Sequence, residues 1–221
     1  MLAENLISDV VPSVRSYENG QKALNLMDVY RVSHIPVVDN LKYLGLVSDK
    51  QIYDLNLLDK PIESELEKLE SSHAHKKQHI FEVAMIMYKL KLSVLPVLDT
   101  EHYYLGAITL YDMARRFAHL FSLQEIGGVI VLEMNVNDYS LAEISKIAES
   151  NGLKILSCFM DRKAGTSNLD IILKFDKEDL SPLIQAFLRY DYNVKAVYHD
   201  NSMLSDLYND RYDQFMKFMN I

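Results

Sequence analysis

The chain has 221 residues, of which 49% are hydrophobic and 24% charged, and it carries a formal net charge of −8. This length and composition are typical of a globular protein with one large domain or two small ones, and we expect two. The acidic balance argues against general binding to nucleic acid or to an anionic membrane, because both favour clustered lysine and arginine.

The N-terminal sequence MLAENLISDVV carries acidic residues where a signal peptide needs a basic region followed by an apolar one. No apolar run along the chain approaches the ~18 residues of a membrane-spanning helix. We therefore expect a cytoplasmic protein with no membrane partner. The single cysteine, Cys158, agrees with a reducing compartment, and its apolar neighbours indicate a small core residue rather than a nucleophile.

The first part of the chain predicts a small unit of strands and helices. A short extended piece at 9–14 precedes a helix at 18–30, in which Ala23, Leu24, Met27 and Tyr30 form one apolar stripe. Strands follow at 35–38 and 46–48, and a second helix at 49–58.

The segment 63–79 is polar and contains three histidines. Imidazole is the commonest metal ligand, and two of these residues would share a helix face, so His73, His75 and His79 are candidate metal ligands. No carboxylate or cysteine completes an obvious set, however, and two adjacent lysines would repel a cation. The interpretation that we favour is a solvated linker with titratable histidines.

The next part of the chain repeats the first. A helix is predicted at 80–90 and strands at 94–98 and 105–109. With an offset of 60 residues, SHIPVVD (33–39) falls on SVLPVLD, and with an offset of 61, YLGLVS (43–48) falls on YLGAIT. This internal duplication predicts two units whose sheets are each too small to bury their apolar faces alone, and pairing supplies the missing partner.

After a predicted linker at 117–125, strands and helices alternate regularly. The predicted elements are strand 129–136, helix 141–150, strand 154–161, strand 169–175, helix 178–190 and strand 193–199. Asp176 is the expected N-cap of the second helix, and its expected apolar stripe is Leu180, Leu183, Ile184, Phe187 and Leu188. The succession of these elements is the ferredoxin-like order. The tail predicts a helix that packs on its own domain or on a second subunit.

The duplicated stretches resemble the cystathionine-β-synthase (CBS) domain, which occurs in tandem pairs called Bateman modules. The resemblance rests on SHIPVVD (33–39) with GLVS (45–48), and on SVLPVLD (93–99) with GAITLYD (106–112). It covers about residues 1–120. It implies a regulatory protein that binds an adenine nucleotide or related adenosyl ligand, such as AMP, ADP, ATP or S-adenosylmethionine, between the repeats.

In that family, a Gly-x-x-Thr/Ser-x-x-Asp signature places a hydroxyl near phosphate at a helix start and an Asp near the two ribose hydroxyls. Thr109 and Asp112 match it in the second repeat, whereas Ser48 is followed three residues on by Gln51 in the first. The resemblance therefore implies one competent adenosine site, at Thr109 and Asp112. The other residues that the resemblance makes candidates for ligand binding are Leu95, Pro96 and Ser48. The alternative is that Thr109 and Asp112 only form a helix capping box.

The chain departs from the family pattern at two positions. Arg31 and Lys91 stand where the family favours glycine. Their basic side chains would either crowd the adenine base or meet a phosphate.

The C-terminal pattern, following a CBS pair, resembles the ACT domain, a family of small amino-acid-sensing modules that usually dimerise. The family's Asp-x-Pro-Gly-x-Leu turn corresponds here to NDYSL (137–141), in which serine replaces the glycine that lets an amino acid approach the backbone. The alternative is a unit that serves dimerisation alone. The whole arrangement is similar to regulatory proteins of the acetoin-utilisation type.

The expected fold class is therefore α+β, a tandem CBS-domain pair followed by a ferredoxin-like (βαββαβ) ACT-type domain. The expected boundaries are 1–62 and 63–120 for the two CBS repeats, 126–200 for the ACT-like domain and 201–221 for a C-terminal helical tail.

The sequence contains no Walker glycine-rich loop, no Gly-x-Ser-x-Gly elbow, no metalloprotease histidine pair and no zinc-type cysteine spacing. We therefore expect a homodimeric ligand-sensing protein rather than an enzyme. Nucleotide binding beside Thr109 and Asp112 would shift the two repeats, and the C-terminal domain would transmit the shift. Two alternatives stay open: a ligand-free dimerisation or interaction scaffold, and a metal-responsive protein that uses the three histidines. The sequence indicates neither the protein partner nor the pathway.

Overall fold

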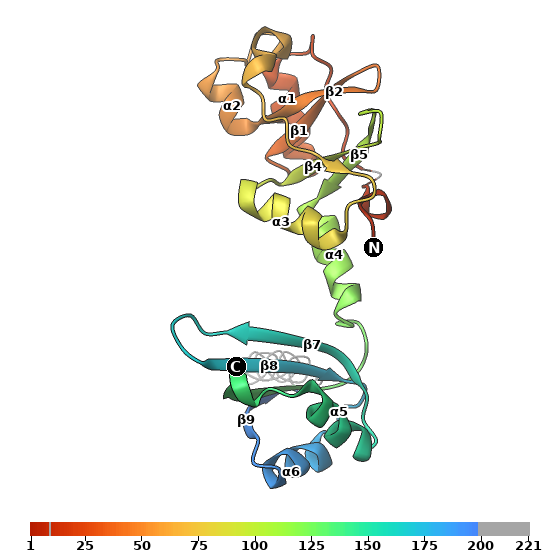
Figure 1. Ribbon diagram of the computed structural model, residues 1–221. Helices are drawn as coiled ribbons and strands as arrows, with labels where there is room; N and C mark the ends of the chain where they lie inside the picture. The colour runs from red at the N-terminus through yellow and green to blue at the C-terminus, as the bar shows by residue number, and fades with distance from the viewer. Residues whose placement is uncertain (9, 199–221) are drawn as a thin grey trace, which may run out of the picture. The chain divides into compact units, whose positions relative to one another are not determined.

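The computed structural model describes residues 1–8 and 10–198 (Figure 1). Contacts between Cα atoms divide the chain into two compact units, Met1–Phe117 and Ala118–Ile221. The predicted helical tail lies outside the described residues. Within the described part of the chain, no helix has both the length and the apolar character needed to cross a bilayer.

The first unit contains the same succession of elements twice, as the duplication predicts. Its helices and strands are η1 (Ala3–Leu6), α1 (Gly20–Tyr30), β1 (His34–Asp39), β2 (Lys42–Ser48), α2 (Asp49–Asp54), η2 (Ile62–Lys68), β3 (Ala74–His75), α3 (Ile80–Leu90), β4 (Val94–Leu98), β5 (Tyr104–Thr109) and α4 (Leu110–Leu120). The predicted boundaries differ most in three places: α2 is shorter than the helix expected at 49–58, β2 begins earlier than expected, and α4 extends into the linker expected at 117–125.

The duplication extends to the pairing of the strands. β1 pairs antiparallel with β2, and β4 with β5, and each pair has a register shift at the equivalent place. Val14 forms a parallel bridge with Val37, and Ala74 pairs in parallel with Val97. The two pairs are related by the same offset of 60 residues. Each repeat therefore has the same three-stranded arrangement, although its first strand is reduced to one or two residues.

The segment 63–79 is not the solvated linker that its polarity predicts. η2 and β3 occupy much of it. The backbone N–H of Leu46 donates to the carbonyl of Glu70 at 2.7 Å, and the Tyr43 hydroxyl donates to the carbonyl of Ser72 at 3.0 Å. These bonds hold the segment along the sheets, and its polar side chains are partly exposed and partly half-buried.

The N-terminal segment packs on the second repeat although it precedes the first in sequence. The N–H of Ala3 donates to the carbonyl of Gln78 at 2.8 Å, and the N–H of Ile80 donates to the carbonyl of Met1 at 3.0 Å. Ala3 and Leu6 are buried in the core of the second repeat. The two repeats are therefore interlocked by the chain.

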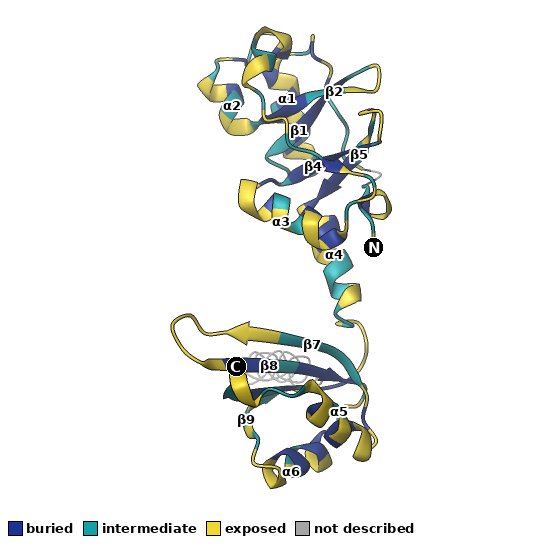
Figure 2. Ribbon diagram, viewed as in Figure 1, coloured by how far each residue is buried: buried dark blue, intermediate teal, exposed yellow. Residues whose placement is uncertain are grey.

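Each repeat has its own apolar core, centred on the buried strands (Figure 2). The buried core of the first repeat is Val14, Ala23, Met27, Ile35, Val37, Val47, Ile52, Leu57 and Ile62. The buried core of the second is Ala3, Leu6, Leu46, Ala74, Ile80, Val83, Met87, Leu92, Leu95, Val97, Ile108 and Met113. Leu46 comes from the first repeat, which ties the two cores together.

The second unit has the ferredoxin-like topology that the sequence predicts. Its elements are β6 (Val129–Asn135), η3 (Val136–Asp138), α5 (Leu141–Ser150), β7 (Ile155–Arg162), β8 (Asn168–Phe175), α6 (Ser181–Arg189) and β9 (Asn193–Tyr198). The strands form one antiparallel sheet in the order β7-β8-β6-β9, and residues of α5 and α6 share one core with it (Figure 1). The predicted fold class is thus confirmed, whereas the ACT-type assignment stays a prediction.

Two expected features of α6 are wrong. Its N-cap is Leu180 rather than Asp176, whose carboxylate instead accepts a hydrogen bond from the N–H of Lys154 at 2.8 Å. Leu188 is exposed, although Leu183 and Phe187 of the predicted stripe are fully buried. Pro182 in the first turn lets the helix begin later, because proline fits best where no helical N–H bond is required.

Candidate functional site

The residues of the nucleotide signature lie where β5 passes into α4. Thr109 ends the strand, and Asp112 lies in the first turn of the helix. The Thr109 hydroxyl donates to Oδ2 of Asp112 at 2.6 Å, and the N–H of Asp112 donates to Oγ1 of Thr109 at 3.0 Å. Both residues are buried. The helix-capping contact expected as the alternative is therefore present, and it fixes the carboxylate in one orientation.

A cavity of about 600 Å³ opens at this junction, and both repeats contribute to it. Its walls come from the N-terminal segment, the end of α1, the residue before β4 and the start of α4. The lining residues are Ile7, Ser8, Val10, Val11, Tyr30, Arg31, Val32, Ser93, Thr109, Leu110, Tyr111, Asp112 and Arg115. The cavity thus combines an apolar wall with hydroxyl, carboxylate and guanidinium groups.

Two arginines give this cavity its positive charge. Arg31 follows α1 in the left-handed conformation, with φ of 55°, which explains why a glycine is favoured at this position. Arg115 is one turn beyond Asp112, and its Nη2 lies 3.7 Å from Oδ1 of Asp112. Guanidinium groups bind phosphate through paired, charge-assisted hydrogen bonds. The cavity can therefore accept an anionic ligand.

The other predicted ligand-binding residues lie elsewhere. Leu95 and Pro96 are buried within β4 and do not line this cavity. Ser48 caps α2, where its hydroxyl accepts from the N–H of Gln51 at 3.1 Å. The structure therefore brings together only Thr109 and Asp112 of the five predicted residues.

The equivalent position in the first repeat is already engaged. Oε1 of Gln51 accepts from the N–H of Ser48 at 3.0 Å, and its Nε2 donates to the carbonyl of Lys68 at 3.1 Å. Both ends of the amide are therefore bonded to backbone groups.

Several residues that line the cavity are not candidates from the sequence, among them Arg115, Ser93 and the N-terminal segment. Arg115 had a usable signal, because it stands three residues after Asp112 and so shares a helix face with it. Ser93 and the N-terminal residues Ile7, Ser8, Val10 and Val11 had none, because they reach the cavity only through contacts between distant segments.

A polar contact beside the cavity joins the two repeats. The N–H of Ser33 donates to Oγ of Ser93 at 2.9 Å, and the N–H of Ser93 donates to Nδ1 of His34 at 3.3 Å. Oγ of Ser93 lies 3.0 Å from the same ring nitrogen. Burial lowers the pKa of His34, although the charges of Asp49 and Glu70 oppose this shift. The neutral ring, with its lone pair on Nδ1, is the form that fits these contacts.

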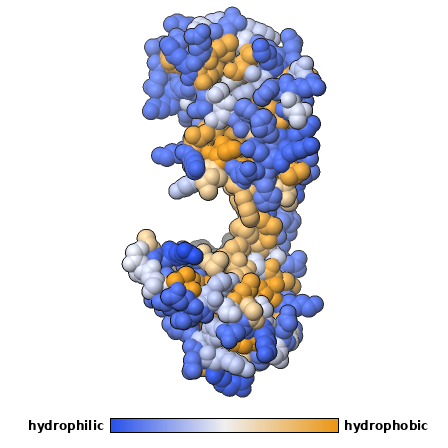
Figure 3. All heavy atoms as spheres, in the orientation of Figure 1, coloured by the Kyte–Doolittle hydropathy of each residue, from blue (hydrophilic) through white to orange (hydrophobic). Residues whose placement is uncertain are grey.

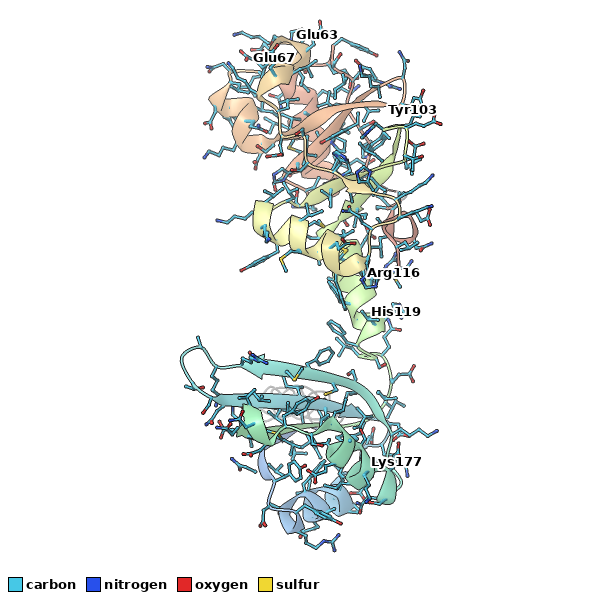
Figure 4. The ribbon with its side chains drawn as sticks, in the orientation of Figure 1. Glu63, Glu67, Tyr103, Arg116, His119 and Lys177 are labelled. Carbon is cyan, nitrogen blue, oxygen red and sulfur yellow. The ribbon has the colours of Figure 1, made fainter. Side chains whose placement is uncertain are left out.

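The three candidate histidines do not lie together, and His102 takes the place of His79 beside the other two. The rings of His73 and His75 lie 5.2 Å apart, and each lies about 6 Å from the ring of His102, which precedes Tyr103 in the β4–β5 turn (Figure 4). His79 caps α3 instead, with its ring against Phe81. As the side chains of the described residues lie, no three His, Cys, Asp or Glu are arranged to hold a metal ion.

Comparisons with known proteins place the duplication in a family. The family model of the CBS domain matches residues 3–56 and 73–119. The inosine-5'-monophosphate dehydrogenase of Methanocaldococcus jannaschii is 29% identical over 114 residues, which cover 51% of this chain and 23% of the enzyme. That of Bacillus subtilis is 25% identical over 134 residues, which cover 58% of this chain and 28% of the enzyme. The chain thus spans about a quarter of the length of these curated relatives.

Among solved structures, a CBS domain pair/ACT domain protein from Thermotoga maritima is 22% identical to this chain, with a TM-score of 0.48. The match covers 54% of this chain and 98% of the Thermotoga chain. The two family matches fall on the two repeats that the strand pairing relates. The CBS part of the predicted resemblance is therefore confirmed: the first unit contains two CBS domains in tandem.

Proposed function

We propose that the CBS pair is a regulatory module that binds an adenine nucleotide in the cavity at the β5–α4 junction, within a cytoplasmic protein that has no catalytic activity of its own. The observation that carries this proposal is the buried Thr109–Asp112 pair on the wall of a cavity shared by both repeats. Because Oδ2 of Asp112 is bonded to Thr109, Oδ1 is the atom that would accept hydrogen bonds from a ribose.

The size and charge of the cavity support a phosphorylated ligand. Its volume of about 600 Å³ is within the range of small-molecule sites. Arg31 and Arg115 would meet phosphate oxygens, whereas Val11 and Val32 offer an apolar wall for a base. AMP, ADP and ATP fit this charge better than S-adenosylmethionine, because two guanidinium groups would repel its sulfonium.

We also propose a homodimer that transmits the signal, with the ferredoxin-like unit as an ACT-type output domain. An apolar groove of about 740 Å³ lies between α3 and α4, and apolar surface gathers there (Figure 3). Its lining includes Met87, Tyr88, Leu92, Met113 and Phe117. A second copy would cover apolar surface that a monomer leaves in water. The molar mass in solution tests this assembly.

Isothermal titration with AMP, ADP, ATP and S-adenosylmethionine tests nucleotide binding. We expect saturable binding of at least one adenine nucleotide and its loss in Asp112→Ala. Gln51→Ala is the matched control, because Gln51 occupies the equivalent position in the first repeat, and it should leave the affinity within about twofold.

Two results would decide against the proposal. If no nucleotide produces heat or raises the melting temperature, the alternative of a ligand-free interaction scaffold replaces it. If Gln51→Ala abolishes binding and Asp112→Ala does not, the ligand site belongs to the first repeat.

A further inference from the structure

The contact between the repeats is asymmetric at a position where the duplication predicts symmetry. Ser33 and Ser93 are equivalent, and the N–H of Ser33 donates to the hydroxyl of Ser93. The N–H of Ser93 does not donate the matching bond to the hydroxyl of Ser33. It donates instead to Nδ1 of His34, whose equivalent in the second repeat is Val94. A titratable acceptor therefore replaces a hydroxyl on one side of this contact.

The protonation state of His34 decides whether this bond exists. A ring nitrogen accepts a hydrogen bond only when it carries a lone pair. When Nδ1 is protonated, its N–H faces the N–H of Ser93, and the bond becomes a repulsion between two donors. The hydroxyls of Ser33 and Ser93, at 3.1 and 3.0 Å from Nδ1, can turn to accept from the charged ring, but the backbone N–H cannot.

Ser93 connects His34 to the nucleotide cavity. Ser93 lines the cavity itself, and its carbonyl accepts from the N–H of Leu110 at 3.1 Å. Leu110 is the first residue of α4 and stands between Thr109 and Asp112 in the chain. A displacement of Ser93 would therefore move the helix turn that carries the ribose-binding carboxylate.

We propose that His34 is a positioning residue for nucleotide binding: through Ser93, its neutral ring holds the second-repeat site in the binding-competent arrangement, and its protonation lowers nucleotide affinity. This inference rests on the proposed function of the cavity. The charged groups that face His34 are Asp49, at the start of α2, and Glu70, in the segment before β3. Both favour the protonated ring, whereas burial opposes it and lowers the pKa of His34.

The expected pH dependence follows from the fraction of protein that can bind. If only the neutral form binds, the apparent affinity falls with the neutral fraction and approaches a tenfold loss per pH unit below the pKa of His34. By linkage, nucleotide binding weakens proton binding to His34 by the same factor by which protonation weakens nucleotide binding, so the pKa of His34 falls. Because burial holds this pKa below the ordinary histidine value, we expect the loss of affinity at a lower pH than for an exposed histidine.

Titration of AMP into the full chain between pH 5 and pH 8 tests the proposal on the wild type and two variants. In His34→Asn, the side-chain oxygen replaces Nδ1 as an acceptor that does not titrate. We expect it to bind AMP within about threefold of the wild type at pH 7.5 and to lose the extra decline at low pH. In His34→Val, which adopts the residue of the second repeat, the acceptor is absent, and we expect at least about tenfold weaker binding at pH 7.5.

The variants also control for other titrating groups, since the phosphate of AMP and the remaining histidines are present in all three titrations. A wild-type profile that coincides with that of His34→Asn, with AMP bound at pH 7.5, would overturn the role of His34 and leave the proposed function intact. Absence of binding by any nucleotide at pH 7.5 overturns both. Proton NMR of the His34 ring supplies an independent readout, because its pKa should fall when AMP is added.

Discussion

At the scale of single residues, Arg31 lowers the stability of the fold through its backbone conformation but supplies a positive charge to the cavity. Its φ of 55° lies in the left-handed region, which costs a non-glycine residue ~1–2 kcal/mol. The conformation is required because the N–H of Arg31 turns back to the carbonyls of α1 and ends the helix. A glycine would relieve this strain, but it would also remove one of the two guanidinium groups on the cavity wall.

We therefore expect Arg31→Gly to change stability and binding in opposite directions. The free energy of unfolding should rise by up to ~1 kcal/mol, because the left-handed strain is relieved. ATP affinity should fall by ~10- to 100-fold, as for the loss of a charged hydrogen bond, whereas adenosine affinity should change little. Urea unfolding and calorimetric titration measure the two quantities.

Arg116→Gln is the control for the removal of a positive charge. Arg116 follows Arg115 on α4 but donates to the carbonyl of Asn5 and does not line the cavity (Figure 4). If both variants weaken ATP binding equally, the effect of Arg31 is one of general charge, and its assignment to the phosphate is wrong.

At the scale of elements, the start of α1 is fixed by the loop that follows α2. The N–H of Gly20 donates to the carbonyl of Leu57 at 2.8 Å. A methyl group at Gly20 would lie 2.7 Å from that carbonyl oxygen and 2.7 Å from Cγ2 of Ile52. The helix therefore approaches its neighbour more closely than any side chain permits.

We predict that Gly20→Ala destabilises the first unit by ~1–3 kcal/mol through overpacking, although alanine is the better helix former. Asn25→Ala, at an exposed position of the same helix, should shift the unfolding free energy by no more than ~0.5 kcal/mol. Chemical denaturation of the two variants provides the comparison. An increase in stability for Gly20→Ala would show that helix propensity outweighs the packing against Leu57.

At the scale of the whole molecule, the exposed apolar residues of α3 are candidates for the contact between two copies of the chain in the proposed homodimer. Phe81, Met85 and Tyr88 are exposed by half or more and recur at helical spacing on one face. Tyr88 also lines the groove beside α4. Aromatic residues at the centre of an apolar interface often contribute most of its binding energy.

We expect Tyr88→Glu to weaken dimerisation by at least ~30-fold, which corresponds to ~2 kcal/mol for a central interface residue. Tyr17→Glu introduces the same charge at another exposed tyrosine, outside the groove, and should leave the dimer intact. Sedimentation equilibrium of the two variants and the wild type measures the association. A wild-type mass of 25.5 kDa, that of one chain, would contradict the homodimer.

The sequence alone determined the order of the main helices and strands in both units, but not the short elements η1, η2, β3 and η3. Apolar periodicity located α3, β4 and α5 at the observed residues, because these elements bury one face and the pattern is local. The duplication predicted paired repeats, and the spacing of Thr109 and Asp112 predicted that both would stand at a helix start. Such features depend on residues a few positions apart.

Only the tertiary structure decided which distant residues meet. It brought Arg31 and the N-terminal segment to the cavity of the second repeat, and it joined His34 to Ser93. It also placed His102, rather than His79, beside His73. These neighbours are separated by tens of residues, and their contacts arise because the repeats interlock through backbone pairing, which leaves no period in the sequence. Local sequence patterns therefore predicted the two repeats, whereas the packing of the repeats against each other formed the cavity at the β5–α4 junction.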